Sequence, residues 1–293
     1  MKKIVKQAFT LIELLVVIAI IGILSGLIVV AMGGVIDKAN IAKSQVFSNS
    51  LKNSLMLGLV SEWKFDEGSG QTSSDLWGGN NGTLGGTASV ESSDPTWITS
   101  GCPAGSCLSF DGGDYILVLD NASLDNMNHI SIFAWVKTST SGEMDVIEKL
   151  QYYVAGIQGY GLVVYNGGLN YHFCTSFGCY NTLKGSGITD GKWHYIGYTY
   201  DGSNINSYID GKNLGTQAAT GTMQGNTLNL NIGKRSASTY YFTGLIDEPR
   251  VFNEATSISK IKEQYYTGLN NLLINGGINK EEYISRINTL AIK

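Results

Sequence analysis

The sequence predicts an α+β protein in which a long N-terminal helix carries an antiparallel two-sheet β-sandwich, followed by two short C-terminal helices. Three observations lead to this prediction. An uncharged apolar run lies near the N-terminus, aromatic and β-branched segments fill the middle, and the residues after Phe252 shift to Ile, Lys, Glu and Asn. The 37 glycines, 16 tyrosines and only 3 prolines fit many short strands joined by glycine turns.

Length and charge narrow the classes of protein. The 293 residues leave room for one domain of about 200 residues beside the N-terminal helix. The net charge is −4, and no basic block follows the lysines at the start of the chain. We therefore expect no nucleic-acid partner, because that binding depends mainly on clustered basic side chains.

The apolar run over residues 14–36 contains no charged side chain. At about 1.5 Å per residue, a helix of this length crosses the ~30 Å hydrocarbon core of a bilayer. Apolar residues continue at three- and four-residue steps up to Leu57, and Gly58 is a natural helix stop. We therefore expect one helix over 9–57 whose first half spans a membrane. The run exceeds the ~7–15 residues of a secretory signal core.

Glu13 stands directly before this run. A carboxylate inside a bilayer costs about 2.5–3.5 kcal/mol on insertion scales, so it requires a cationic partner. No lysine or arginine follows within the run. A plain membrane anchor would not need such a residue.

The motif FTLIE at residues 9–13, behind a short basic leader, resembles the class III signal peptide of type IV pilins and pseudopilins. The resemblance implies that a prepilin peptidase removes residues 1–8 by cutting between Ala8 and Phe9, and that the new Phe9 amine is methylated. It also implies that Glu13 pairs with the N-terminus of a neighbouring subunit. The precursor would then lie in the inner membrane, and the mature chain in a cell-surface filament.

Five further segments, in order, resemble concanavalin A-like, laminin G-like jelly rolls. They lie at 58–70, 108–112, 190–195, 208–212 and 244–252. The resemblance implies a jelly-roll domain over 58–256, built from two packed antiparallel sheets.

Local patterns in this region favour the same architecture. Residues 130–136 and 193–200 are rich in aromatic and β-branched side chains, as strands are. The pairs at 201–202 and 210–211, both Asp-Gly, are typical of tight hairpin turns. We expect Trp63, Trp135 and Trp193 in the core.

The four cysteines form two C-x4-C pairs, Cys102 with Cys107 and Cys174 with Cys179. In an exported domain this even number predicts two local disulfides. Crossed pairing, or one zinc site with four thiolates, is the alternative.

Asp247 shares a strand face with apolar residues and is expected to point inward. A buried carboxylate needs either a cation or hydrogen-bond donors. The jelly-roll resemblance implies a structural calcium between Asp247 and backbone carbonyls, assisted by Asp66 or Asp111. Backbone amides are the alternative, and no cofactor is required for function.

Glu143, Asp145 and Glu148 form an E-x-D-x-x-E pattern, which is similar to that of retaining β-glucanases with a jelly-roll fold. That chemistry needs two carboxyl groups ~5–5.5 Å apart. At this spacing the three residues face one side only if a β-bulge intervenes. The aromatic flanks of the hydrolase motif are missing, so we expect no enzyme, and a hydrolase using Glu143 and Glu148 is a remote alternative.

Ligand contacts are expected from tyrosines, whose flat rings stack on sugars. The candidates are Tyr152, Tyr153, Tyr240 and Tyr241. After the sandwich, residues 257–274 and 280–290 show helical periodicity and are separated by Gly276 and Gly277, which predicts a C-terminal helical hairpin over 257–293.

These inferences predict a structural subunit of a pilus-like filament that assembles with other pilin subunits. Its lectin-like head would bind a carbohydrate or cell-surface ligand for adhesion. The alternative is a pseudopilin of a type II secretion or DNA-uptake system.

Overall fold

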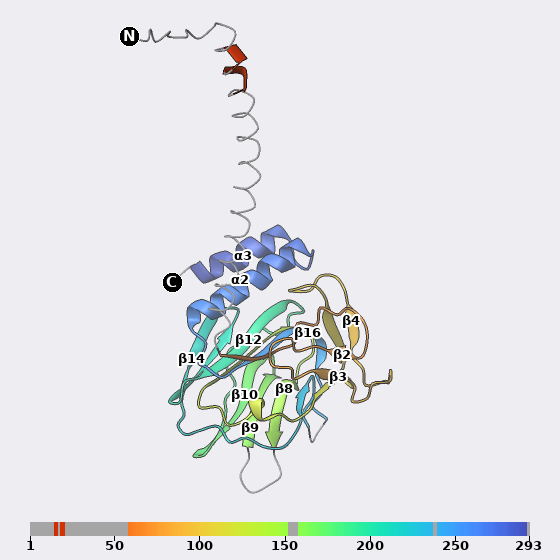
Figure 1. Cartoon of the computed structure of the whole chain (residues 1–293). Helices are drawn as coiled ribbons and strands as arrows, with labels where there is room; N and C mark the ends of the chain where they lie inside the picture. Colours follow the sequence, from red (N-terminus) through yellow and green to blue (C-terminus); the bar gives the residue numbers. More distant parts are fainter. Residues whose placement is uncertain (1–14, 17, 21–57, 152–157, 237–238, 292–293) are drawn as a thin grey trace, which may run out of the picture. The chain divides into compact units, whose positions relative to one another are not determined.

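The computed structural model describes residues 15–16, 18–20, 58–151, 158–236 and 239–291 (Figure 1). The chain divides into two compact units, Met1–Leu57 and Gly58–Lys293. In the first unit, residues 15, 16 and 18–20 are helical. The remainder of the predicted helix over 9–57, with most of the predicted span over 14–36, lies outside the described residues. Within the described ranges, no helix combines the length and the apolar character needed to span a bilayer.

In the second unit, the described strands form two antiparallel sheets, as the sequence predicted. The first sheet has a seven-strand path, and β1 (Leu59–Glu62) pairs with its strand β16. The path runs β14 (Lys212–Ala218), β13 (Asn204–Ile209), β12 (Trp193–Tyr200), β7 (Ile130–Lys137), β16 (Thr243–Phe252), β5 (Cys107–Asp111) and β4 (Thr96–Ile98).

The second sheet has eight strands in one path. Its order is β11 (Gly178–Asn181), β10 (Gly168–Thr175), β9 (Gln158–Tyr165), β8 (Glu143–Gln151), β15 (Leu230–Ile232), β6 (Ile116–Val118), β3 (Gly82–Leu84) and β2 (Thr72–Ser73). A short 3-10 helix, η1 (Ala122–Leu124), follows β6.

The core lies between the two sheets, and β7 shows how the sequence builds it. Ile132, Ala134 and Val136 alternate along β7 and belong to the core cluster. The intervening Phe133 and Trp135 are also fully buried, although they face the other way. A strand buried on both faces reads as a nearly continuous apolar run, and the three predicted core tryptophans are all buried.

The outer face of the first sheet is covered by α2 (Ile258–Ile274), beside which lies α3 (Lys280–Ala291) (Figure 1). Tyr265 of α2 stacks on Trp135 with ring centroids 5.5 Å apart. Gly268 lies so close to Trp135 that an added Cβ would be 2.4 Å from the indole ring. The two C-terminal helices are confirmed, and Ser257 caps α2 by accepting a hydrogen bond from the Lys260 amide.

Turn chemistry fixes the β13–β14 hairpin. Asp210 and Gly211 both have positive φ angles, 52° and 74°. A two-residue hairpin turn of this kind requires positive φ at both positions, which Asp-Gly tolerates well. The turn predicted from this dipeptide is therefore confirmed.

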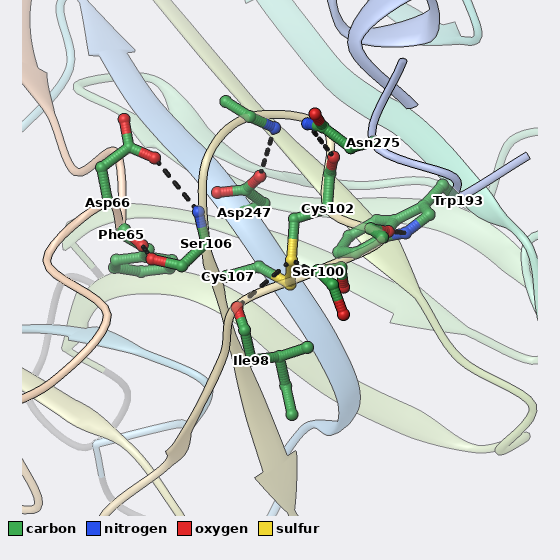
Figure 2. The surroundings of a disulfide bond; sticks show 12 residues. Phe65, Asp66, Ile98, Ser100, Cys102, Ser106, Cys107, Trp193, Asp247 and Asn275 are labelled. Carbon is green, nitrogen blue, oxygen red and sulfur yellow. Dashed lines mark hydrogen bonds between the residues drawn. A yellow bond between two sulfur atoms is a disulfide. The ribbon is translucent and has the colours of Figure 1, made fainter. Parts of the chain in front are cut away.

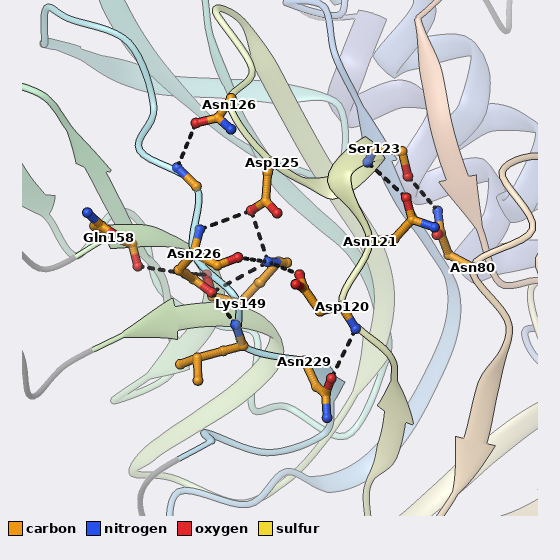
Figure 3. Close-up of polar contacts among 12 residues, drawn as sticks. Asn80, Asp120, Asn121, Ser123, Asp125, Asn126, Lys149, Gln158, Asn226 and Asn229 are labelled. Carbon is orange, nitrogen blue, oxygen red and sulfur yellow. Dashed lines mark hydrogen bonds and ion pairs between the residues drawn. The ribbon is translucent and has the colours of Figure 1, made fainter.

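A buried lysine ties the loops at one end of the second sheet. The Lys149 side chain is fully buried, and its Nζ lies 2.8 Å from Asp120 Oδ1 and 2.9 Å from Asp125 Oδ1 (Figure 3). It also donates to the Asn226 carbonyl at 2.7 Å. Because a buried ammonium must be paired, this one cation joins the segments after β6, after η1 and before β15.

Candidate functional site

Three carboxylates of β8 gather on the outer face of the second sheet. The pairing of β8 with β9 shifts register between Asp145 and Ile147. This irregularity satisfies the condition stated for the E-x-D-x-x-E spacing, because it lets Glu148 reach the same face as Glu143 and Asp145. The bulge that this spacing required is therefore present in β8.

A single guanidinium meets all three carboxylates. Arg235, in the connection from β15 to β16, donates from Nε to Asp145 Oδ2 at 2.8 Å and from Nη2 to Asp145 Oδ1 at 3.0 Å. Its Nη2 also donates to Glu143 Oε1, and its Nε lies 3.8 Å from Glu148 Oε1. Bidentate pairing of this kind fixes both partners.

Burial changes the proton affinity of the cluster. It raises the pKa of Asp145 to about 6, against the opposing effect of Arg235. Burial and the neighbouring Asp145 charge raise the pKa of Glu148 to about 8. Burial, followed by the Arg235 charge, lowers the pKa of the adjacent His172 to about 4. At neutral pH the imidazole is therefore uncharged and Glu148 largely retains its proton.

Glu143, Asp145 and His172 are, among the described residues, the group whose ligand atoms could hold a metal ion, all within 4.8 Å of one another. Arg235 already lies against the two carboxylates. A metal ion would have to displace this guanidinium.

The burial of these carboxylates limits their access to a substrate for hydrolysis. The side chains of Asp145 and Glu148 are 0% exposed, whereas Glu143 is 21% exposed. A sugar cannot reach Glu148 without movement of the residues above it.

Aromatic rings lie beside this cluster. The guanidinium carbon of Arg235 is 4.1 Å from the centroid of Tyr240, a residue that is 38% exposed. Lys234 Nζ is 3.6 Å from the Tyr115 centroid and 5.8 Å from that of Tyr241. The structure thus brings Tyr240 and Tyr241 to neighbouring cations. The other two candidate tyrosines, Tyr152 and Tyr153, lie outside the described residues.

Sequence reasoning missed Arg235, His172 and Lys234. Arg235 is 90 positions from Asp145, and nothing in its local sequence indicates a partner. The only signal was a basic pair directly after a short apolar strand in an acidic chain.

The predicted calcium residues separate into two places. Asp247 Oδ2 accepts from the Ala104 amide at 3.0 Å, and Asp66 Oδ1 accepts from the Ser106 amide at 3.3 Å, so both border the loop inside the first disulfide (Figure 2). Asp111 instead pairs with Thr243, four residues from Asp247 along β16. At ~3.3 Å per residue this is about 13 Å, so Asp111 cannot share an ion with Asp247.

The environment of Asp247 disfavours the charged form of its carboxyl group. Its side chain is fully buried, and burial, with the nearby Glu248 and Asp66 charges, raises its pKa well above the usual range. Its described partners are the amides of Ala104 and Glu248. Backbone donors, the alternative in the sequence interpretation, are therefore present.

The two local disulfides are confirmed. Cys102 pairs with Cys107, and Cys174 pairs with Cys179 across the β10–β11 hairpin. The alternatives of crossed pairing and a zinc site do not apply.

Two stacked antiparallel sheets, with a charged outer face and exposed aromatic rings beside it, define a sandwich-type binding domain. The chain belongs to the concanavalin A-like lectin/glucanases superfamily, whose laminin G-type model matches residues 110–262, more than half of the chain. Residues 5–34 match the prokaryotic N-terminal methylation motif, so the chain joins a pilin-like N-terminus to this domain. Both resemblances predicted from the sequence are confirmed.

Solved structures share the fold at low identity. The binding domain of Paraclostridial Mosquitocidal Protein 1 matches with a TM-score of 0.58 and 15% identity, over 73% of this chain and 53% of that one. Domain 4 of AbnA, an extracellular arabinanase from Geobacillus stearothermophilus, was solved with arabinotriose. It matches with a TM-score of 0.56 and 18% identity, over 71% of this chain and 98% of that one. The binding domain of Botulinum neurotoxin serotype G matches with a TM-score of 0.54 and 14% identity, over 72% of this chain and 51% of that one.

This chain therefore covers about half the length of the two toxin domains. The comparison with curated proteins gives no match.

Glu148 generates a prediction about pH. Because its pKa is raised from 4.5 to about 8, the folded protein holds a proton that the unfolded chain releases. The free energy of unfolding should therefore fall as pH rises from about 5 through 8, by up to about 1.4 kcal/mol per pH unit. Glu148→Gln should flatten this dependence in denaturant titrations at several pH values. The exposed Glu281→Gln is the control, and an unchanged slope in Glu148→Gln would contradict the assignment.

Proposed function

We propose that this chain is an exported subunit of a type IV pilus-like filament whose sandwich head binds glycans on a surface. The methylation motif over 5–34 supports the filament part, and membership of a lectin-containing superfamily supports the binding part. The observation that carries the binding part is the Tyr240 ring, which is 38% exposed and rests on the Arg235 guanidinium.

The N-terminal chemistry supports assembly. Cleavage after Ala8 frees the Phe9 amine, and a methylated ammonium is a suitable partner for Glu13 in lipid. A misplaced subunit would leave that carboxylate unpaired at a cost of several kcal/mol. Prepilin peptidase is therefore the first partner, and other pilin subunits are the next.

The head acts by binding rather than by hydrolysis in this proposal. Glu148, one of the two glutamates that hydrolysis would need, is fully buried, and the cation beside it is the protein's own Arg235. Tyr240 offers a flat apolar surface next to a fixed charge, which suits a sugar ring that has one apolar face and many hydroxyls. The arabinotriose complex of the AbnA domain shows that this fold can carry a sugar.

The filament part is tested on sheared surface filaments. Mass spectrometry should find a chain that starts at methylated Phe9, and Glu13→Ala should reduce incorporation into filaments strongly while the precursor still accumulates in the membrane. Glu281→Ala, an exposed position of α3, is the matched control. Uncut precursor in the filaments, or equal incorporation of Glu13→Ala, would refute this part. Scarce copies confined to the envelope would favour a pseudopilin.

The binding part is tested with the purified full-length protein on immobilised oligosaccharides. Tyr240→Ala should lower binding about tenfold, the equivalent of ~1.4 kcal/mol, because it removes the stacking surface. Tyr240→Phe keeps the ring and should bind like the wild type. If alanine and phenylalanine behave alike at an unchanged melting temperature, Tyr240 is not the contact.

We also propose that a structural calcium binds between Asp66 and Asp247. Two carboxylates converge on one loop there, Asp247 is fully buried, and no described salt bridge reaches either residue. Burial, followed by the Glu248 and Asp66 charges, raises the pKa of Asp247, and a calcium ion would offset both effects by pairing with the buried carboxylate.

Calcium should therefore raise the melting temperature and chelator should reverse the change. At 100 times the dissociation constant, mass action stabilises by about 2.7 kcal/mol. Asp247→Asn should remove the response, whereas Asp111→Asn should leave it, because Asp111 lies elsewhere in the sheet. A melting temperature indifferent to calcium would leave the backbone amides as the sole partners of Asp247.

A further inference from the structure

The ordered loop between β2 and β3 exposes two large apolar side chains to solvent. Leu76 is 90% exposed and Trp77 is 52% exposed. Exposed apolar side chains of this size lose the favourable burial of about 1.5–3 kcal/mol each. When two stand next to each other on an ordered loop, a binding role is the natural explanation.

The loop cannot fold back to bury them, because Asp75 holds its backbone. The Asp75 carboxylate is 3% exposed and accepts from the amides of Trp77 and Gly78 at 3.0 Å, and from that of Asn80 at 3.1 Å. Gly78 packs so closely that an added Cβ would lie 2.1 Å from the Val60 carbonyl oxygen. The exposure is thus built into the loop and does not reflect loose packing.

Leu76 forms one wall of a pocket of ≈ 400 Å³. The pocket is lined by Glu62, Lys64, Asp66, Glu67, Ser74 and Leu76. Glu67 Oε1 accepts from the Ser74 amide at 2.7 Å, which links the two sides of the pocket. Arg250 pairs with Glu62 at 2.7 Å, which leaves the carboxylates of Asp66 and Glu67 against the Lys64 ammonium. Without calcium on Asp66, the pocket therefore has a small net negative charge.

We propose that this pocket is a second glycan site, which binds a neutral or amino sugar against its Leu76 wall and extends it over Trp77, the exposed residue next to Leu76 in the chain. Carboxylates accept hydrogen bonds from sugar hydroxyls, and Lys64 donates to ring or hydroxyl oxygens. An aromatic ring and a leucine suit the apolar face of a pyranose. The volume falls in the range of small-molecule pockets and accommodates one or two sugar units.

The charge of the pocket selects among sugars. With Glu62 paired to Arg250, Asp66 and Glu67 still outnumber Lys64, so uronic and sialic acids are repelled from the calcium-free protein, whereas neutral and amino sugars are accepted. The Tyr240 site is different, because its ring rests on the Arg235 guanidinium. The inference extends the proposed glycan binding and does not depend on Tyr240.

A sugar fits this surface better than a protein or a membrane does. A stable protein interface buries about 800 Å² per partner, far more than two side chains provide. An anionic lipid surface would be repelled by the carboxylates of Asp66 and Glu67.

The experiment uses the full-length protein in detergent, with cellotriose and chitosan trisaccharide as neutral and amino-sugar probes and trigalacturonic acid as the anionic probe. Calorimetry measures affinity. The difference in tryptophan fluorescence between wild type and Trp77→Phe isolates the Trp77 signal from that of the partly buried Trp97 and of the three buried tryptophans. Both measurements are made with chelator, so that Asp66 carries no calcium. We expect binding of at least one of the first two probes, about tenfold weaker in Trp77→Ala. Trp77→Phe should keep the affinity and lose most of the fluorescence change.

The controls separate this site from the rest of the head. Val90→Ala changes another side chain that is 84% exposed and lies outside the pocket lining, and it should bind like the wild type. Tyr240→Ala should leave Trp77-dependent binding unchanged, so failure of the Tyr240 site and failure of this one are distinguishable. Melting temperatures confirm folding of each variant.

Four results would overturn the proposal. These are the absence of binding to both non-acidic probes at millimolar concentration, equal affinity in Trp77→Ala, a preference for trigalacturonic acid, and a Trp77 effect seen only on vesicle binding or self-association.

Discussion

The outer face of the second sheet depends on one ion-pair cluster, in which the Arg235 guanidinium meets three carboxylates of β8. Asp145 and Glu148 both have fully buried side chains. Glu148 largely keeps its proton, whereas the buried Asp145 charge would be costly without the Arg235 partner. The register shift in β8 gathers the acids on one side, and the β15–β16 connection must then bring a cation to them. Tyr240 follows from the same constraint, since its ring rests on that guanidinium and its carbonyl accepts from the Asp145 amide. Charge neutralisation therefore positions the aromatic ring that we assign to ligand binding.

A second constraint is the Cys102–Cys107 disulfide, whose turn contacts two strands of the first sheet and the end of α2. At the start of the loop closed by the Cys102–Cys107 disulfide, the Cys102 carbonyl accepts from Asn275 Nδ2 at 3.3 Å (Figure 2). The carbonyl of the preceding residue, Gly101, accepts from Trp193 Nε1 at 2.9 Å. The same loop donates the Ala104 amide to Asp247. One cross-linked turn thus joins β12, β16 and the end of α2. Because the disulfide restricts the backbone, this loop loses less conformational entropy on making these contacts than an open chain would.

Local patterns predicted the sandwich, the hairpin turns, the helices and both disulfides, because each depends on residues close together in the sequence. The Asp-Gly turn at 210–211 and the C-x4-C pairs are examples. The site was harder to predict, because its geometry comes from register. The E-x-D-x-x-E spacing indicated that a bulge would be needed, yet nothing in the sequence located Arg235 opposite it. Asp111 and Asp247 likewise looked equivalent as ligands until strand pairing placed Asp111 beside Thr243.

The head presents two exposed aromatic side chains, and the filament display that we propose would determine what such surfaces can achieve. Tyr240 lies on the Arg235 guanidinium, whereas Trp77 follows Leu76, which lines a pocket with acidic side chains. Each surface is small, so each alone would bind a sugar weakly. A filament repeats the head many times along its length, and each bound copy raises the effective concentration of the next. In the function that we propose, two weak sites on each repeated head would therefore give firm attachment to a glycan surface without a deep cleft on any single head.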